Sequence, residues 1–138
     1  MPRVLIADDE DLIRNLLRTI IGRKGCDVTV AADGAEALAL LDRRVFDLLV
    51  LDLMMPVVNG YDVLAHLATM KKRPTVLVVT AMTGERFLDL DSKIVTAILR
   101  KPFDTGLFAD IAAQLARAMA ATRGTVAPTV AEARRIEA

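Results

Sequence analysis

Acidic, hydroxyl and basic side chains stand at the ends of separate apolar runs in this sequence. Asp8 and Asp9 follow the first run, Asp52 follows the most apolar one, Thr80 ends another, and Lys101 follows the last. An acidic pair by itself is more often a solvated turn or a helix cap than a metal site. A carboxylate that ends a buried apolar stretch is different, because it is costly unless it is paired or functional. Asp52 is therefore the first candidate for chemistry.

If these side chains converge, the chemistry they can support is phosphoryl transfer. Three carboxylates about 4 Å apart repel one another by roughly 4 kcal/mol for each pair at an effective dielectric near 20, so they need a cation or shared protons. An all-oxygen site with room for water and a phosphate suits Mg²⁺. A lysine and a threonine hydroxyl can contact phosphoryl oxygens, whose charge must be neutralised during transfer. The set predicts a site that forms an aspartyl phosphate on Asp52.

The segments that would position these residues alternate between strands and helices. Strands are predicted at Arg3–Ala7, Asp27–Ala31, Phe46–Leu51, Thr75–Val79 and Ile94–Leu99. Helices are predicted at Asp11–Gly22, Ala35–Leu41, Tyr61–Met70 and Thr105–Thr122, with a short one within Thr83–Lys93. Parallel strands need crossover connections, so the pattern predicts a parallel sheet with helices on both faces. The carboxyl ends of such strands share one edge, where ligands bind.

Length and composition are those of one globular domain. The chain has 138 residues, of which 54% are hydrophobic and 26% charged, and 18 basic residues balance 18 acidic ones. A nucleic-acid site would need a basic excess on one face, so none is expected. The single Cys26 cannot form an internal disulfide, and no apolar stretch is long enough to span a bilayer. We expect a cytoplasmic protein that is not integrated in a membrane.

Four motifs make the chain resemble a response-regulator receiver domain over residues 2–122. They are Val4–Glu10, Leu51–Pro56 with Gly60, Thr80-Ala81, and Lys101–Phe103, in family order and with family-like spacing. The resemblance implies an α/β, flavodoxin-like (βα)5 three-layer sandwich whose five-stranded parallel sheet has the order 2-1-3-4-5. This strand order is taken from the family. We expect the receiver domain to occupy residues 1–122, and residues 123–138 to be a C-terminal tail or the start of a linker.

The resemblance also implies a Mg²⁺ site beside the phosphoacceptor Asp52. Asp9 and Asp52 would ligate the ion directly, whereas Asp8 would act largely through water. The backbone carbonyl of Met54 would complete the ligands that the protein supplies.

Further family roles concern the phosphoryl group and its donor. Thr80 would hydrogen-bond the phosphoryl group, Lys101 would pair with it, and the Lys101–Pro102 peptide bond would be cis. A histidine kinase or phosphotransfer protein would dock near the first helix and the loop after Lys101. The domain would catalyse only its own phosphorylation and dephosphorylation, and so would not be an enzyme in the usual sense.

The sequence departs from the family pattern near the fifth strand. Ile98 stands where relatives commonly place an aromatic switch residue, and Ile94 and Val95 replace a usual Gly-Ala pair. These positions fall on the face formed by the segment before the fifth strand, that strand and the last helix, which receivers often use for dimerisation and effector contact. We expect a monomer or weak homodimer that signals to a downstream protein through this altered face, with Thr83–Lys93 as the segment that phosphorylation orders.

Two other functional classes remain to be compared with this one. An aspartate-nucleophile phosphatase would have an Asp-x-Asp motif after its first strand. Here the candidate nucleophile Asp52 follows the third predicted strand, and the next residues are Leu53-Met54. The altered face at Ile98 permits a pseudo-receiver that only binds partners, but the full acidic set argues against it. A P-loop nucleotide site is excluded, because the chain has no Gly-rich loop ending in Gly-Lys-Ser/Thr. Both a stand-alone adaptor and the receiver part of a longer protein fit the sequence.

Overall fold

The computed structural model describes residues 1–81 and 90–124. Along the chain the elements are β1 (Arg3–Ala7), α1 (Asp11–Arg23), β2 (Asp27–Ala31), α2 (Gly34–Arg43), β3 (Leu48–Leu51), α3 (Gly60–Ala68), β4 (Thr75–Thr80), β5 (Val95–Arg100) and α4 (Thr105–Gly124). Each strand and helix predicted outside Thr83–Lys93 is present, with ends within a few residues. The short helix predicted within Thr83–Lys93 and the tail predicted at 123–138 lie largely outside the described residues.

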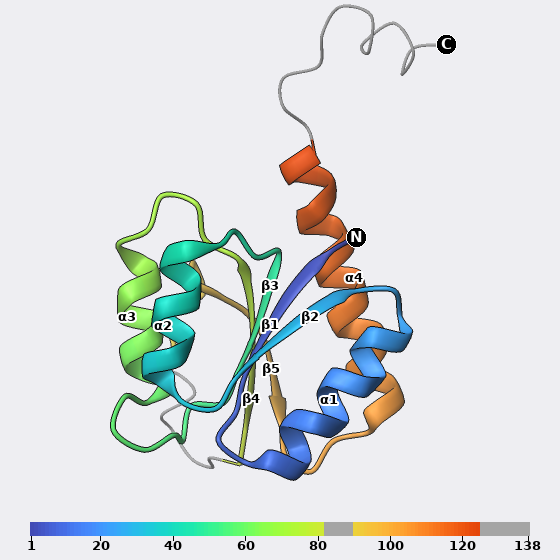
Figure 1. Ribbon diagram of the computed structural model, residues 1–138, viewed down its shortest axis with the longest axis horizontal. Coiled ribbons are helices and arrows are strands. Elements are labelled where there is room, and N and C mark those ends of the chain that lie inside the picture. The colour runs from blue at the N-terminus through green and yellow to red at the C-terminus, as the bar shows by residue number, and fades with distance from the viewer. Residues whose placement is uncertain (82–89, 125–138) are drawn as a thin grey trace, which may run out of the picture.

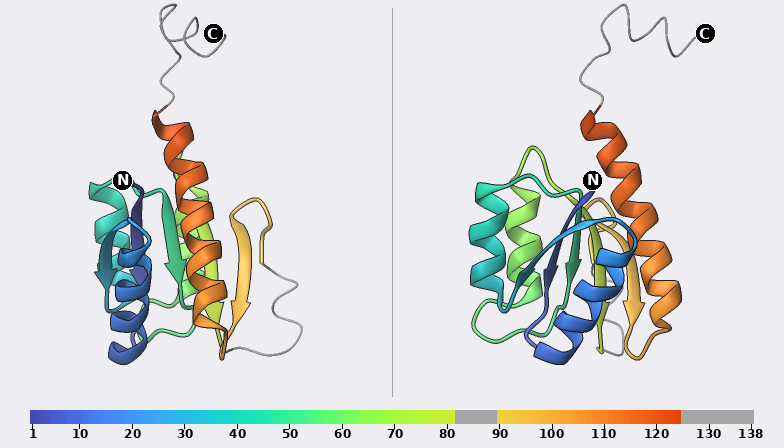
Figure 2. Two further views of the ribbon diagram at one scale, coloured as in Figure 1. Left: turned by 90° about the vertical axis from the view of Figure 1, so that its right-hand side faces the viewer. Right: turned by 45° about the vertical axis from the view of Figure 1, so that its right-hand side comes forward.

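The five strands form one parallel sheet in the order β2-β1-β3-β4-β5, which confirms the flavodoxin-like prediction. Helices α2 and α3 cover one face of the sheet and α1 and α4 the other, which gives three layers (Figure 1). Figure 2 shows the same layers from the side, with α4 continuing past the edge at which the strands begin. At the opposite edge, the ends of β1, β3, β4 and β5 come together.

Alternation along the buried strands divides the core in two. Leu5 and Ala7 of β1 belong to the apolar cluster beneath α2 and α3, whereas Val4 and Ile6 belong to the cluster beneath α1 and α4. All four side chains are fully buried. Because a shift of one residue would exchange the two faces, this double burial fixes the register of β1 against its neighbours.

The loop that follows β3 is held by close backbone packing at the start of α3. Asn59 caps α3 in a capping box with Asp62, which satisfies the first backbone N–H groups of the helix. A Cβ atom on Gly60 would lie 2.5 Å from the Cα of Leu53 and 2.6 Å from the backbone oxygen of Asp52. Only glycine permits this approach, so Gly60 fixes the position of the chain directly after Asp52.

Strand β3 begins two residues later than predicted, and a buried carboxylate explains the difference. Asp47 is fully buried, and its Oδ2 accepts a hydrogen bond from the backbone N–H of Arg3 at 2.7 Å. The backbone N–H of Asp47 in turn donates to the carbonyl oxygen of Arg3 at 2.8 Å. The Asp47 side chain thus takes part in the sheet's hydrogen bonding, and regular pairing begins at Leu48.

Within the described part of the chain, no helix has both the length and the apolar character needed to cross a membrane.

Candidate functional site

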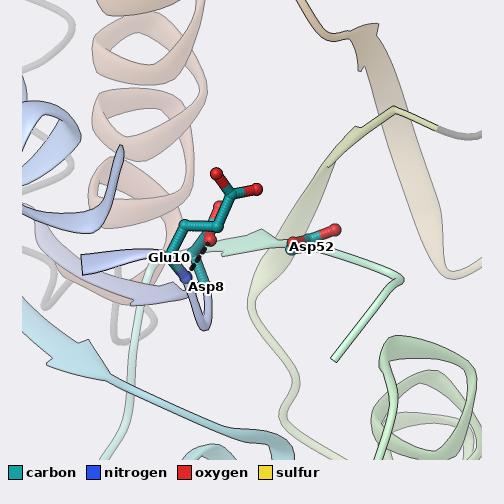
Figure 3. Close-up of side chains that lie close together, drawn as sticks. All are labelled: Asp8, Glu10 and Asp52. Atoms are coloured by element: carbon teal, nitrogen blue, oxygen red, sulfur yellow. Dashed lines mark hydrogen bonds between the residues drawn. The ribbon is translucent and has the colours of Figure 1, made fainter. Parts of the chain in front are cut away.

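The predicted polar residues converge at the carboxyl edge of the sheet. Lys101, directly after β5, places its Nζ 3.1 Å from Asp8 Oδ2, 3.4 Å from Glu10 Oε1 and 3.5 Å from Asp52 Oδ2. Figure 3 shows Asp8 and Glu10 approaching from the end of β1 and Asp52 from the end of β3. Lys101 thus contacts carboxylates that lie 93, 91 and 49 residues away along the chain. The sheet topology brings these groups into contact, as the strand-end pattern predicted.

Asp52 is a buried carboxylate that is only partly compensated. Its side chain is 4% exposed, and its Oδ1 accepts a hydrogen bond from the backbone N–H of Met54 at 3.0 Å. Burial raises the pKa of Asp52 to about 6, although the Met54 N–H and the Lys101 charge lower it; the charges of Asp8 and Asp9 raise it further. With a pKa near 6, Asp52 is mainly ionised at neutral pH, and its Oδ2, which faces Lys101 and is not bonded by the Met54 N–H, is the oxygen placed for attack or ligation.

Lys101 is held in its charged form by its neighbours. Burial lowers the pKa of Lys101, but the charges of Asp52, Asp8 and Glu10, together with the hydrogen bond to Asp8, more than offset this and raise the pKa above its usual value. The side chain is 11% exposed. The Lys101–Pro102 peptide bond is cis, as the family resemblance implied.

Thr80 and Lys101 are joined through the backbone. Thr80 ends β4 and is fully buried, and its carbonyl oxygen accepts a hydrogen bond from the backbone N–H of Lys101 at 2.8 Å. The hydroxyl donor and the ammonium group are therefore carried by neighbouring strand ends with a fixed relative position. The role predicted for the Thr80 hydroxyl on a phosphoryl group stays a prediction.

Glu10 belongs to the acidic cluster, although no role is predicted for it from the sequence. The backbone N–H of Glu10 donates to Asp8 Oδ1 at 2.9 Å, and Arg14 Nη1 donates to the carbonyl oxygen of Asp8 at 2.9 Å. These bonds turn the chain after β1 so that the Glu10 side chain reaches Lys101. The available signal was its place directly after Asp8-Asp9 at a strand end.

Asp9 points to a different part of the same edge. Its side chain is exposed and lines a groove of about 420 Å³ with the β3–α3 loop. The residues that line this groove are Asp9, Leu53, Met54, Met55, Pro56, Asn59 and Tyr61. Asp9 is close enough to Asp52 for its charge to raise the pKa of Asp52. Direct ligation of a metal by Asp9, and by the backbone carbonyl of Met54, stays a prediction.

The geometry of the cluster suits a bound cation. One carboxylate oxygen from each of Asp8, Glu10 and Asp52 lies within 4.8 Å of the other two, and Asp8 and Asp52 are buried. Three carboxylates face one ammonium group, so the ionised cluster keeps a net charge of about −2 that a dication would neutralise. The oxygen ligands present can therefore hold a metal ion.

Comparison with known proteins agrees with the fold and the site. A family model described as the response regulator receiver domain matches residues 4–113. The transcriptional regulatory protein CpxR of Klebsiella pneumoniae subsp. pneumoniae is 42% identical over 120 residues, covering 85% of this chain and 50% of CpxR. The chain thus spans about half the length of this relative.

Two solved structures share the fold over most of the chain. The receiver domain of the Francisella response regulator 1452 has a TM-score of 0.78 and 30% identity, covering 85% of this chain and 98% of that one. The response regulator protein TrrA of Thermotoga maritima, solved in complex with Mg²⁺-BeF, has a TM-score of 0.74 and 30% identity, covering 83% and 99%.

Proposed function

Since the chain belongs to the response regulator receiver domain family, we propose that it accepts a phosphoryl group on Asp52 from a histidine kinase or phosphotransfer protein. The observation that carries the proposal is the Lys101 ammonium group, which lies among the carboxylates of Asp8, Glu10 and Asp52. A cation next to a buried, ionised nucleophile is what transfer of a charged phosphoryl group needs.

The proposed step uses Oδ2 of the Asp52 carboxylate, the oxygen that faces Lys101. This oxygen attacks phosphorus, the bond between phosphorus and the donor atom breaks with its electrons leaving on the donor, and an aspartyl phosphate forms. Lys101, 3.5 Å from Asp52 Oδ2, then pairs with a phosphoryl oxygen, while the Met54 N–H holds the other oxygen of Asp52 in place. Thr80 completes the contacts from the end of β4.

We propose Mg²⁺ as the cation of the site. Asp8, Asp52 and Glu10 or Asp9 supply carboxylate oxygens on this proposal, and the Met54 carbonyl adds a further ligand. When bound, the ion neutralises the carboxylates and the charge on the phosphoryl oxygens. The Mg²⁺-BeF complex of TrrA, a relative with 30% identity, supports this choice. In this reading the domain catalyses only its own phosphorylation and dephosphorylation.

The donor would dock across the carboxyl edge, beside α1 and the start of α4. Exposed leucines surround that part of the edge: Leu12 is 87%, Leu16 is 47% and Leu107 is 54% exposed. An apolar surface next to charged catalytic groups is suited to a protein donor rather than to a small molecule.

The wider setting of the domain is also proposed. Residues 1–122 would form the receiver, followed by a tail or linker at 123–138, in a cytoplasmic monomer or weak homodimer. A downstream protein would be contacted through the face that includes Ile98, which is 38% exposed.

The test is incubation with acetyl phosphate and Mg²⁺ followed by intact-mass measurement. We expect one phosphoryl adduct, stable in acid and labile in base, that is absent from Asp52→Asn. Asp110→Asn is the matched control, because Asp110 is an exposed aspartate on α4 that pairs with Lys24. An adduct that persists in Asp52→Asn would refute the assignment, and no adduct despite bound Mg²⁺ would favour a pseudo-receiver.

A further inference from the structure

A second polar recess lies at the opposite edge of the sheet, where the strands begin. It has a volume of about 300 Å³ and is lined by Arg3, Asp27, Thr29, Arg44 and Phe46. The proposed phosphoryl chemistry uses none of these side chains.

Two arginines reach this recess from different elements. Arg3 is the first residue of β1 and pairs in register with Asp27 of β2, while Thr29 lies two residues further along β2. Arg44 is the first residue after α2, where the backbone becomes extended at φ −133° and ψ 152°. The recess is thus walled on one side by the β1–β2 ladder and on the other by the end of α2.

The polar groups of the recess have no ion pair among themselves. Within residues 1–81 and 90–122, neither the Arg3 nor the Arg44 guanidinium forms an ion pair, although Arg3 and Asp27 are cross-strand neighbours. Over the same residues the Thr29 hydroxyl has no hydrogen-bond partner. Each guanidinium group has five N–H donors, and the Thr29 hydroxyl adds one O–H donor. Over these residues, the donors around the recess are thus available to hydrogen-bond a ligand.

Helix dipoles explain only some of the basic residues at this edge. Arg23 and Arg43 lie in the last turns of α1 and α2, where a cation complements the helix dipole. Arg3 is on a strand, so the dipole gives no reason for its charge. Arg43 does not line the recess, which makes it a natural control for Arg44.

We propose that this recess binds a phosphate-class oxyanion, either inorganic phosphate or the phosphate group of a small ester. Two planar guanidinium groups can bind such an anion through paired N–H donors, and Thr29 adds a hydroxyl donor. The Asp27 carboxylate would accept a hydrogen bond from a protonated phosphate oxygen or from a hydroxyl of the ester. Phe46 is 4% exposed and forms an apolar floor.

The experiment is a titration of the full chain followed by the amide NMR shifts of Thr29 and Arg44 at constant ionic strength. Inorganic phosphate is one probe and ribose 5-phosphate the other, and saturation by either one identifies the source of the anion. We expect Arg44→Gln to weaken binding by about tenfold or more, and Arg43→Gln by less than about twofold. Arg3→Gln should weaken binding as Arg44→Gln does.

Shifts that do not saturate with either probe would overturn the proposal. Equal weakening in Arg43→Gln and Arg44→Gln would also overturn it, because it would show general attraction to a basic edge. Asp52→Asn is expected to bind both probes as the unmodified protein does. Failure of this site and failure of phosphorylation at Asp52 are therefore distinguishable.

Discussion

The central strands β1 and β3 and the edge strand β5 differ in how deeply their side chains are buried. At the ends of β1 and β3, Asp8 and Asp52 are 2% and 4% exposed and each has identified partners. Along β5 burial alternates, Ile98 is 38% exposed, and the pairing with β4 shifts register between Val76 and Leu77. Strands β1 and β3 have a neighbour on each side, whereas β5 is at the end of the sheet.

The difference shows where substitution is tolerated. A buried charge in the centre needs its partners, because an unpaired one costs several kcal/mol. A half-exposed side chain on an edge strand has few such partners and can change without loss of the fold. The family's acidic residues are therefore present at the ends of β1 and β3, while the departure at Ile98 lies on the edge strand β5.

The largest expected effect comes from removing the cation that contacts the carboxylates at the ends of β1 and β3. Lys101→Ala should slow phosphorylation by acetyl phosphate about 100-fold or more, because the variant loses the ammonium group that pairs with a phosphoryl oxygen and leaves the bound ion to offset that charge alone. The rate is measured by intact mass against time. Lys24→Ala, which removes an exposed lysine paired with Asp110, should leave the rate unchanged. A similar loss of rate in both variants would show that the position of Lys101 in the carboxylate cluster is not the cause.

The second expected effect is on stability: the difference in free energy of unfolding between Asp52→Asn and the unmodified protein should depend on pH. Its pKa is about 6 in the folded chain and 3.8 in the unfolded chain, so its contribution to stability is full below pH 3.8 and is lost as pH rises through 6. Asp52→Asn keeps an acceptor for the Met54 N–H but has no charge to bury. It should therefore be more stable than the unmodified protein by up to about 3 kcal/mol at pH 8 without Mg²⁺.

The measurement is urea unfolding at pH 4 and at pH 8. The advantage of Asp52→Asn should fall to about 0.5 kcal/mol at pH 4. At pH 8 it should shrink when Mg²⁺ is added, because the ion stabilises the unmodified carboxylate cluster. An equal advantage at both pH values would mean that the Asp52 charge is not the cause.

Gly60 tests the packing that positions the residues after Asp52. Gly60→Ala should destabilise the fold by about 1–3 kcal/mol, since its Cβ would meet the backbone of Asp52 and Leu53 at under 3.0 Å. Gly22→Ala is the matched control, because no atom lies within 4 Å of its added Cβ in helix α1. That control should gain about 0.5–1 kcal/mol. Thermal unfolding of both variants measures the contrast.

The smallest effect concerns Val57 in the β3–α3 loop. Val57 is 99% exposed and has a φ of 65°, a conformation that a β-branched residue rarely adopts. Val57→Gly should raise the free energy of unfolding by about 0.5–1 kcal/mol, because glycine removes the steric cost. Val45→Gly, at a valine that is 47% exposed, should lower it. A loss of stability in Val57→Gly would show that the loop is not strained.

The strands and the polar residues at their ends could be predicted from the sequence better than side-chain contacts between distant residues. Apolar runs ending in Asp8, Asp52 and Lys101 identified the strands and the edge where they meet, because burial on both faces leaves a strong pattern. The start of β3 is an example. The apolar pattern puts Asp47 inside the predicted strand, because the hydrogen bond that sets it apart comes from Arg3, 44 residues away.

Glu10 was missed for a similar reason, since its contact with Lys101 spans 91 residues. The same limit applies to the recess at Arg3 and Arg44, which only the folded chain brings together. Short-range patterns thus predict strands and their ends, whereas long-range side-chain contacts need the structure.

The most direct test of Asp52 as the phosphoacceptor compares phosphorylation of three proteins. They are the unmodified protein, Ile98→Tyr and Asp52→Asn. Each protein is incubated with acetyl phosphate and Mg²⁺, and the fraction carrying one phosphoryl group is followed by intact mass. We predict equal fractions for the unmodified protein and Ile98→Tyr, and none for Asp52→Asn. No adduct on the unmodified protein, or an equal adduct on Asp52→Asn, would contradict the assignment of Asp52 as the phosphoacceptor.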